Sequence, residues 1–245
     1  MMGAKAPTSG QLKHESTWPT LDVSNASLPT KFYASEEWPK CAGTIEHIKD
    51  QSVCGSCWAV AASEVVADRI CIANYDSITS NVRNASIIDM SAEQILSCCK
   101  WCGYGCQGGY TIDAMKYWCL YGVVTGGTSY YLLPQNVRHL QAEIMTRGPI
   151  ECIYTVYENF ITYKSGVYNR VEGRKMGGHA VKVVGWGETK DGLPYWIINN
   201  SWNSTWGMNG TFWMLRGSNF CGIESYCVAG IAKKHDRNFQ LRCDA

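Results

Sequence analysis

The spacing of apolar and polar residues predicts helices in the first half of the chain and strands in the second. From Cys57 to about Ile72, apolar residues recur at helical spacing without Gly or Pro, which predicts a central helix with one apolar and one polar face. Further helices are predicted from the capping box Ser91-Ala92-Glu93-Gln94 to about Cys98, over 112–121 and over 137–147. Alternating or continuous apolar runs predict strands over 150–157, 179–186, 194–199 and 211–216.

Helices that come before strands are typical of an α+β fold, with a helical half over about 28–136 and a β half over about 137–231. Residues 1–27 are rich in Ser, Thr and Pro and are interpreted as a mobile leader. Residues 232–245 are interpreted as a C-terminal tail. Between the helices, residues 123–136 are expected to be short and irregular.

The cysteine content indicates the cellular compartment of the protein. The 245 residues include 13 Cys, which indicates an oxidising environment and a disulfide framework. Glycosylation sequons agree with this; they begin at Asn25, Asn84, Asn199, Asn203 and Asn209. Residues 1–13, however, lack the apolar core of a signal peptide.

Net charge and hydropathy exclude two classes of partner. A formal net charge of +1 offers no electrostatic basis for binding nucleic acid or an anionic membrane. No apolar run approaches the roughly 20 residues that span a bilayer.

Cys57 is the candidate nucleophile. It would be the first residue of the central helix, where free N–H groups and the helix dipole favour a thiolate. A thiolate is a strong nucleophile, whereas any one of 13 cysteines is by default a structural half-cystine. The position at the helix start favours the nucleophile.

His179, Asn200 and Gln51 are candidate partners of Cys57. His179 opens an apolar strand after Gly177 and Gly178, so the backbone would hold its ring rigidly. Each of these residues has an ordinary alternative: a packed His, a turn Asn and a surface Gln. Their combination with Cys57 favours a catalytic constellation.

The stretches Cys54-Gly55-Ser56-Cys57-Trp58, Gly177-Gly178-His179-Ala180 and Asn200-Ser201-Trp202 resemble the papain family of cysteine proteases. That family places its His and Asn roughly 130–150 residues after the cysteine; Asn200 meets this spacing and His179 falls slightly short. The resemblance is strongest to the cathepsin B-like branch and covers residues 28–231. It implies a papain-like fold with a cleft between a helical half and an antiparallel sheet or barrel. It also implies that residues 1–27 are the remnant of a propeptide.

The resemblance also implies roles for individual residues. Cys57 attacks a peptide carbonyl, His179 transfers the proton, Asn200 orients His179, and Gln51 with the Cys57 N–H forms the oxyanion hole. Pairing with His179 would lower the pKa of the Cys57 thiol from about 8.5 to roughly 3–4. Substrate would be bound by Gly108, Gly109, Trp58, Gly178, Trp202, Tyr226 and Ile153. The implied disulfides are Cys41–Cys71, Cys54–Cys106 and Cys99–Cys102. No metal or organic cofactor is implied.

Two departures bear on specificity. The segment between Gly126-Gly127 and Tyr130-Tyr131 has no room for the occluding loop of cathepsin B, whose two histidines grip a substrate's C-terminal carboxylate. An endopeptidase without that exopeptidase activity is therefore expected. Tyr226 stands where the branch has an acidic pocket residue, and Ile153 replaces a small one, which predicts apolar or aromatic side chains in that pocket.

Several alternatives stay open. The shortened connection over 123–136 is compatible with an inactive or misassembled chain that acts by binding only. Cys54 and Cys57 form a CxxC pair that could serve a thiol–disulfide oxidoreductase, although the expected βαβ context is missing. A metal site could be formed by Cys98, Cys99, Cys102 and Cys106, although the second zinc knuckle that such a site normally has is missing. Without the loop, Cys98 would be an orphan thiol, and Cys119, Cys152, Cys221, Cys227 and Cys243 also lack assigned partners.

The expected partners are peptide or protein substrates and cystatin-type inhibitors, with no nucleic acid and no membrane. By resemblance, the expected location is lysosomal or secreted.

Overall fold

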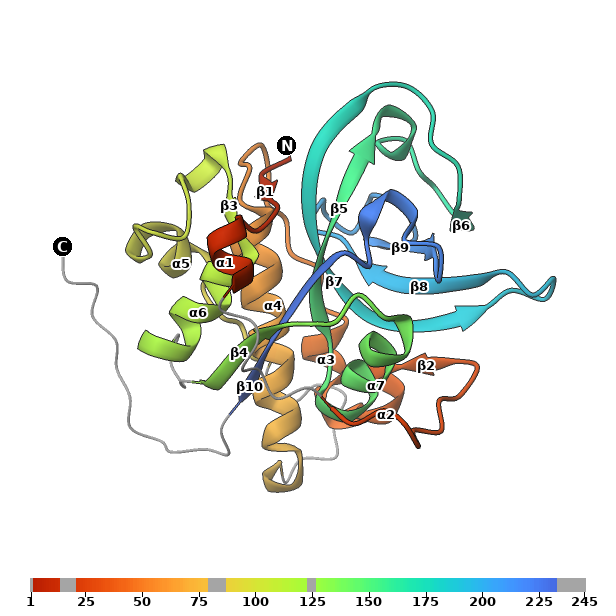
Figure 1. Ribbon diagram of the computed structural model, residues 1–245, viewed down its shortest axis with the longest axis horizontal. Coiled ribbons are helices and arrows are strands. Elements are labelled where there is room, and N and C mark those ends of the chain that lie inside the picture. The colour runs from red at the N-terminus through yellow and green to blue at the C-terminus, as the bar shows by residue number, and fades with distance from the viewer. Residues whose placement is uncertain (1, 14–20, 79–86, 123–126, 233–245) are drawn as a thin grey trace.

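Helices and strands segregate into two halves, as the sequence predicts (Figure 1). The computed structural model describes residues 2–13, 21–78, 87–122 and 127–232. The main helices begin and end close to their predicted positions: α4 spans Cys57–Ala73, α5 Ala92–Cys98, α6 Thr111–Tyr121 and α7 Val137–Arg147. Three short helices precede or flank them: α1 (Ser9–Lys13), α2 (Ala34–Glu37) and α3 (Ala42–Ile45).

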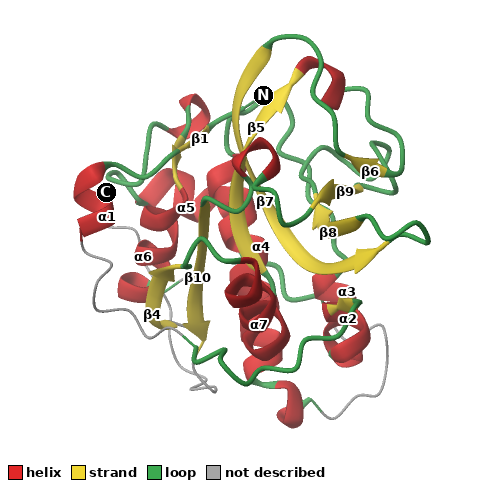
Figure 2. Cartoon of the chain, turned by 45° about the vertical axis from the view of Figure 1, so that its right-hand side comes forward, coloured by secondary structure: helices red, strands yellow, loops and turns green. Residues whose placement is uncertain are grey.

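Helix α4 lies near the centre of the molecule, with α5 and α6 on one side and the sheet on the other (Figure 2). One side packs in an apolar core with Ile95 of α5 and Trp118 of α6. The polar face that the sequence predicts is not exposed, because every residue from Cys57 to Cys71 is buried. Glu64, Asp68 and Arg69 therefore lie inside the protein.

The sheet contains more strands than the sequence predicts. The predicted strands are present as β5 (Ile150–Tyr157), β7 (Lys175–Glu188), β8 (Pro194–Asn199) and β9 (Thr211–Leu215). They are joined by β2 (Phe32–Tyr33), β4 (Gly127–Leu132), β6 (Val167–Tyr168) and β10 (Tyr226–Ala232). The order is β4-β10-β5-β7-β8-β9-β6, with β2 paired to β7. The described strands form an open, mostly antiparallel sheet and no closed barrel.

The expectation of an irregular segment over 123–136 is wrong for its described part. Residues Gly127–Leu132 form β4, which pairs with β10 and continues the sheet toward the helical half. A short β-strand of this kind is stabilised by its partner and leaves a weak local signal.

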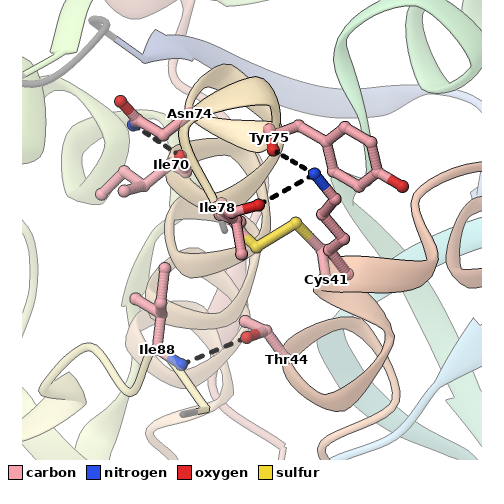
Figure 3. The surroundings of a disulfide bond; sticks show 9 residues. Cys41, Thr44, Ile70, Asn74, Tyr75, Ile78 and Ile88 are labelled. Atoms are coloured by element: carbon pink, nitrogen blue, oxygen red, sulfur yellow. Dashed lines mark hydrogen bonds between the residues drawn. A yellow bond between two sulfur atoms is a disulfide. The ribbon is translucent and has the colours of Figure 1, made fainter. Parts of the chain in front are cut away.

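A disulfide secures the far end of α4 (Figure 3). Cys41 and Cys71 are bonded, as the resemblance implies. Nearby, the Lys40 ammonium donates hydrogen bonds to the carbonyls of Tyr75 and Ile78, at 3.4 and 2.9 Å. The Asn74 side-chain amide donates to the Ile70 carbonyl at 2.8 Å, and the Asn74 N–H donates to the same carbonyl at 3.2 Å. The helix is therefore fixed at its C-terminal end.

The leader is folded where the structure describes it, so the prediction of a mobile leader is wrong for residues 2–13. Ala4 and Lys5 form β1, which pairs in parallel with β3 (Gly109–Tyr110). Helix α1 follows, and the Gln11 amide donates a hydrogen bond to the Asp113 carboxylate of α6 at 2.6 Å. In Figure 1 the N-terminus lies between the helical half and strands β5 and β7.

Among the described residues, no helix is both long and apolar enough to cross a membrane.

Candidate active site

Cys57 is the first residue of α4 and is fully buried. Backbone groups of Ala180 in β7, Gly3 in the leader and Trp58 act to lower the pKa of its thiol, against the larger effect of burial. The helix start therefore points its free N–H groups toward the thiol, as the sequence predicts. The contact with Ala180 places Cys57 next to the strand that carries His179.

His179 is held by two groups from the turn after β8. Its Nε2 lies 2.7 Å from the Asn200 side-chain carbonyl. The Trp202 ring stacks on the imidazole, with ring centroids 4.9 Å apart. Nδ1 has no hydrogen-bond partner among the described residues, so it is the nitrogen left to exchange a proton with Cys57. The predicted trio of His179, Asn200 and Trp202 is thus assembled.

Gln51 lies beside the same turn. Its side-chain carbonyl accepts a hydrogen bond from the Ser201 hydroxyl at 2.6 Å, and its side-chain amide donates to the Cys54 carbonyl at 2.8 Å. The Gln51 N–H donates to the Ser201 carbonyl at 2.9 Å. Ser201, which sequence reasoning did not single out, therefore ties the predicted oxyanion residue to the segment that holds His179.

The leader runs between the two walls of this site. The Gly109 N–H donates a hydrogen bond to the Gly3 carbonyl at 2.9 Å. A Cβ added to Gly108 would overlap the Gly3 carbonyl, and one added to Gly178 would overlap the Ala4 carbonyl. Glycine at these positions therefore lets a peptide backbone approach both halves of the protein closely. The predicted substrate-binding glycines are in contact with a peptide segment of the chain itself.

Burial under the leader decides the protonation of the site. It raises the pKa of the Cys57 thiol, although backbone hydrogen bonds from Ala180 and Gly3 oppose the shift. It lowers the pKa of His179 to about 4, against the opposing effect of the Asn200 hydrogen bond. With the leader in place, both shifts favour the neutral forms of the two groups over the ion pair that the resemblance implies.

A cavity of about 260 Å³ adjoins the site. Ile153, Gly178 and Tyr226 line it, and Ala4 and Ala6 of the leader border it. Ile153 and Tyr226 are cross-strand neighbours on β5 and β10, which explains why residues far apart in sequence meet here. Cys221, a free cysteine that the sequence analysis left unassigned, also lines the cavity. Trp58 is fully buried and supports Gly109 from beneath, so it does not line the cavity.

The cysteine pairing removes two alternatives. Cys54 bonds Cys106 and Cys99 bonds Cys102, as the resemblance implies, while Cys57 is free. A redox pair of Cys54 and Cys57 is therefore wrong. The sulfurs of the suggested metal site are occupied by disulfides.

The resemblance does not imply every disulfide of the protein. Cys152 and Cys227 face each other across β5 and β10 and are bonded. Cys98 is also disulfide-bonded, so the expectation of an orphan thiol is wrong. Cys119 and Cys221 are free, as their lack of assigned partners allowed.

Comparisons with known proteins agree with this geometry. Residues 28–133 and 127–231 match the papain family cysteine protease domain. The chain is 37% identical to cathepsin B-like cysteine proteinase 4 of Caenorhabditis elegans, over 86% of this chain and 78% of that protein. It is 38% identical to cathepsin B-like cysteine proteinase 1 of Ostertagia ostertagi, over 86% of this chain and 75% of that protein. Among solved structures, procathepsin B S9 from Trypanosoma congolense is similar with a TM-score of 0.81 and 33% identity, covering 96% of this chain and 87% of that one.

Proposed function

The chain belongs to the papain family of cysteine proteases, and on this premise we propose that it is a cathepsin B-like endopeptidase held latent by its own leader. The observation that carries the proposal is the position of Gly3 and Ala4. They lie between Gly109 and Gly178, against Cys57. A site that accepts one extended backbone there can accept another of the same shape.

The proposed reaction begins once the leader has left. Loss of its cover returns water to Cys57 and His179 and favours the thiolate–imidazolium pair. The thiolate attacks a peptide carbonyl carbon, and the carbonyl oxygen takes the negative charge. The Cys57 N–H and the Gln51 side-chain amide then donate hydrogen bonds to that oxygen, each typically worth about 3–4 kcal/mol in the transition state.

Proton transfers by His179 complete the reaction. Nδ1 gives its proton to the leaving amine as the C–N bond breaks, and a thioester on Cys57 remains. Nδ1 then removes a proton from water, which attacks the thioester and releases the acid and the thiol. Asn200 keeps Nε2 engaged throughout, so Nδ1 stays directed at the sulfur.

Cleavage inside a peptide chain is the proposed specificity. His47 and His139 are the histidines nearest to the 123–136 connection on either side, so no histidine lies where a loop would grip a C-terminal carboxylate. Ile153 and Tyr226 favour an apolar or aromatic side chain in the adjoining cavity.

The same proposal extends to the cellular compartment and to inhibitors. The disulfides at Cys41, Cys54, Cys99 and Cys152 support an oxidising compartment, lysosomal or secreted. Inhibitors of the cystatin type would compete with the leader for the cleft.

The test uses internally quenched peptides and the full chain, with its leader removed by limited proteolysis. Hydrolysis of a peptide with a blocked C-terminus, lost in Cys57→Ala, is the expected result. Preferential release of C-terminal dipeptides would contradict the endopeptidase proposal. If neither substrate is hydrolysed after the leader has been removed, the result would instead favour the alternative that the protein is inactive and acts only by binding.

A further inference from the structure

One wall of the cavity beside the active site is formed by the loop over 217–225, between β9 and β10. The loop contributes three of the lining residues, Cys221, Gly222 and Ser225. The leader leaves much of this space unfilled, because the side chain that it packs there, against Ile153, is only that of Ala4. A bulkier side chain therefore has room, and the position of the loop decides how much.

Two residues of the loop adopt a backbone conformation that most side chains disfavour. Asn219 has a φ of 52° and Cys221 a φ of 53°. Asn occupies this left-handed region more often than other residues do, whereas Cys rarely does. Such a conformation persists only where surrounding contacts hold it. The shape of the cavity wall therefore depends on contacts that hold the loop against its own preference.

Glu224 supplies such contacts from a buried side chain. Its carboxylate accepts hydrogen bonds from the backbone N–H groups of Gly217 at 2.7 Å and of Asn219 at 2.8 Å. It also accepts a hydrogen bond from the indole N–H of Trp196 at 2.9 Å. Trp196 lies on β8 with its ring buried in the core. One carboxylate therefore ties the beginning of the loop to the interior of the sheet.

Asn219 extends this network to the cavity. Its side-chain carbonyl accepts a hydrogen bond from the Glu224 N–H at 3.0 Å, and its side-chain amide donates to the Ser225 hydroxyl at 2.8 Å. Cys221 lies between these anchored residues. Its thiol, which is free, is thus held on the cavity wall.

We propose that Glu224 is a positioning residue that sets which side chains the cavity accepts, by holding the loop over 217–225 in place. This proposal rests on the proposed endopeptidase function. With the carboxylate present, the wall keeps a shape that admits a bulky apolar or aromatic side chain. Without one of its acceptors, Cys221 relaxes toward an ordinary backbone conformation and the wall changes shape. A side chain as small as that of Ala4 does not depend on the wall.

Glu224→Gln tests this role, because it keeps the size of the side chain but replaces one acceptor oxygen by a donor. Whichever way the new amide turns, its NH₂ group faces an N–H group that the carboxylate had satisfied. The substrates are two peptides that differ only at the residue entering the cavity, Phe in one and Ala in the other. For the chain freed of its leader, the ratio of kcat/KM for Phe over Ala should fall at least about fivefold, through KM, while kcat stays within about twofold.

Glu143→Gln is the matched control. Glu143 is another buried carboxylate, which lies 2.9 Å from the Arg69 guanidinium on α4. Its replacement should lower stability and leave the ratio of Phe to Ala unchanged. An equal fall of the ratio in both variants would attribute the effect to lost stability and would overturn the proposal. An unchanged ratio in Glu224→Gln would overturn it as well.

The Cys221 thiol reports the position of the wall without any hydrolysis. Burial raises its pKa to about 12, so release from the wall should speed its reaction with iodoacetamide. In the full chain with Cys57→Ala, the alkylation rate of Cys221 should rise at least about fivefold in Glu224→Gln and stay the same in Glu143→Gln. Cys119 of α6, also free, is the internal reference and should react equally in both.

The two readouts separate the failure of this proposal from the failure of the proposed function. A Cys221 rate that does not change in Glu224→Gln would show that the carboxylate does not hold the wall. A parent chain that hydrolyses neither peptide would refute the endopeptidase function alone, because the alkylation rates do not depend on it.

Discussion

The Gly3 carbonyl accepts a hydrogen bond from the Gly109 N–H at 2.9 Å, which places the leader on strand β3, next to the candidate nucleophile Cys57. Gly3 also packs against Gly55, where an added Cβ would overlap the Gly55 carbonyl. Gly3→Val should therefore expel the leader and raise the alkylation rate of Cys57 by iodoacetamide at least about tenfold, which corresponds to about 1.4 kcal/mol of lost leader binding. The matched control is Gly10→Ala, whose added Cβ meets only the Thr8 hydroxyl at an ordinary contact distance of 3.9 Å. Equal rates in both variants would show that the leader does not guard Cys57.

Asn200→Ala should lower kcat by about 10²-fold or more, because His179 loses the acceptor that fixes its ring and proton. KM should change little, since Asn200 is buried and its side-chain carbonyl accepts hydrogen bonds from His179 and from the Ser201 N–H. Asn203→Ala is the control: this exposed neighbour bonds Asp50 at 3.2 Å and should retain activity. Steady-state kinetics on one quenched peptide separates the two variants. An Asn200→Ala enzyme with normal kcat would remove this residue from the mechanism.

Acid should loosen the leader. Burial lowers the pKa of His179 to about 4 from an ordinary 6.5. The covered state therefore binds fewer protons than the open one between these values, so the stability of the cover is present above about pH 6.5 and is lost as the pH falls toward 4. Hydrogen exchange at the Gly109 amide, corrected for its intrinsic rate, should speed up at least about tenfold over this window. In His179→Gln, which has no titrating ring, the acceleration should disappear.

Replacing Cys152 and Cys227 by alanine should cost about 2–4 kcal/mol of stability, because the disulfide closes a loop with a separation of 75 residues. The next residues along the two strands are Ile153 and, on β10, Tyr226, which line the cavity. KM for peptides with an aromatic side chain in that cavity should therefore rise as well. Cys119→Ala, which removes a free thiol on α6, serves as the control for loss of a sulfur. Chemical unfolding and KM on the same preparations test both effects, and an unchanged KM would separate the disulfide from the cavity.

Tyr226→Glu should let the cavity accept an arginine side chain. A carboxylate there can form a charge-assisted hydrogen bond with a guanidinium, and we expect kcat/KM on an arginine-containing peptide to increase about tenfold relative to the aromatic one. Tyr226→Gln supplies the same shape without the charge. Should both variants prefer arginine equally, charge would not be the determinant of this pocket.

The sequence predicts the parts of the site that depend on local pattern. The start of α4 at Cys57 follows from helical spacing, and a strand that contains His179 follows from its apolar run, although β7 begins earlier, at Lys175. The partnership of Asn200 and Trp202 with His179 is expected only from the family resemblance, and both residues lie just after strand β8. The elements that position these residues each have a strong periodic signal.

The remainder depends on contacts between distant segments. Strand β10 is short, and both strands that pair with it are far away in sequence. With so many cysteines, their spacing alone does not predict that Cys152 pairs with Cys227. Glu64 and Asp68 look like a solvent face in the helical pattern, and only the presence of Lys182 on another strand makes their burial possible. The leader can lie where it does because Gly108 and Gly178 have no Cβ atoms to collide with its carbonyls. No local sequence pattern reveals this close approach.

The burial of His179 beneath the leader makes the covering of the site depend on pH. Acid favours the uncovered, protonated histidine, and neutral surroundings favour the covered, neutral one. A chain that meets neutral pH before its leader has been cut away should therefore return to the covered form.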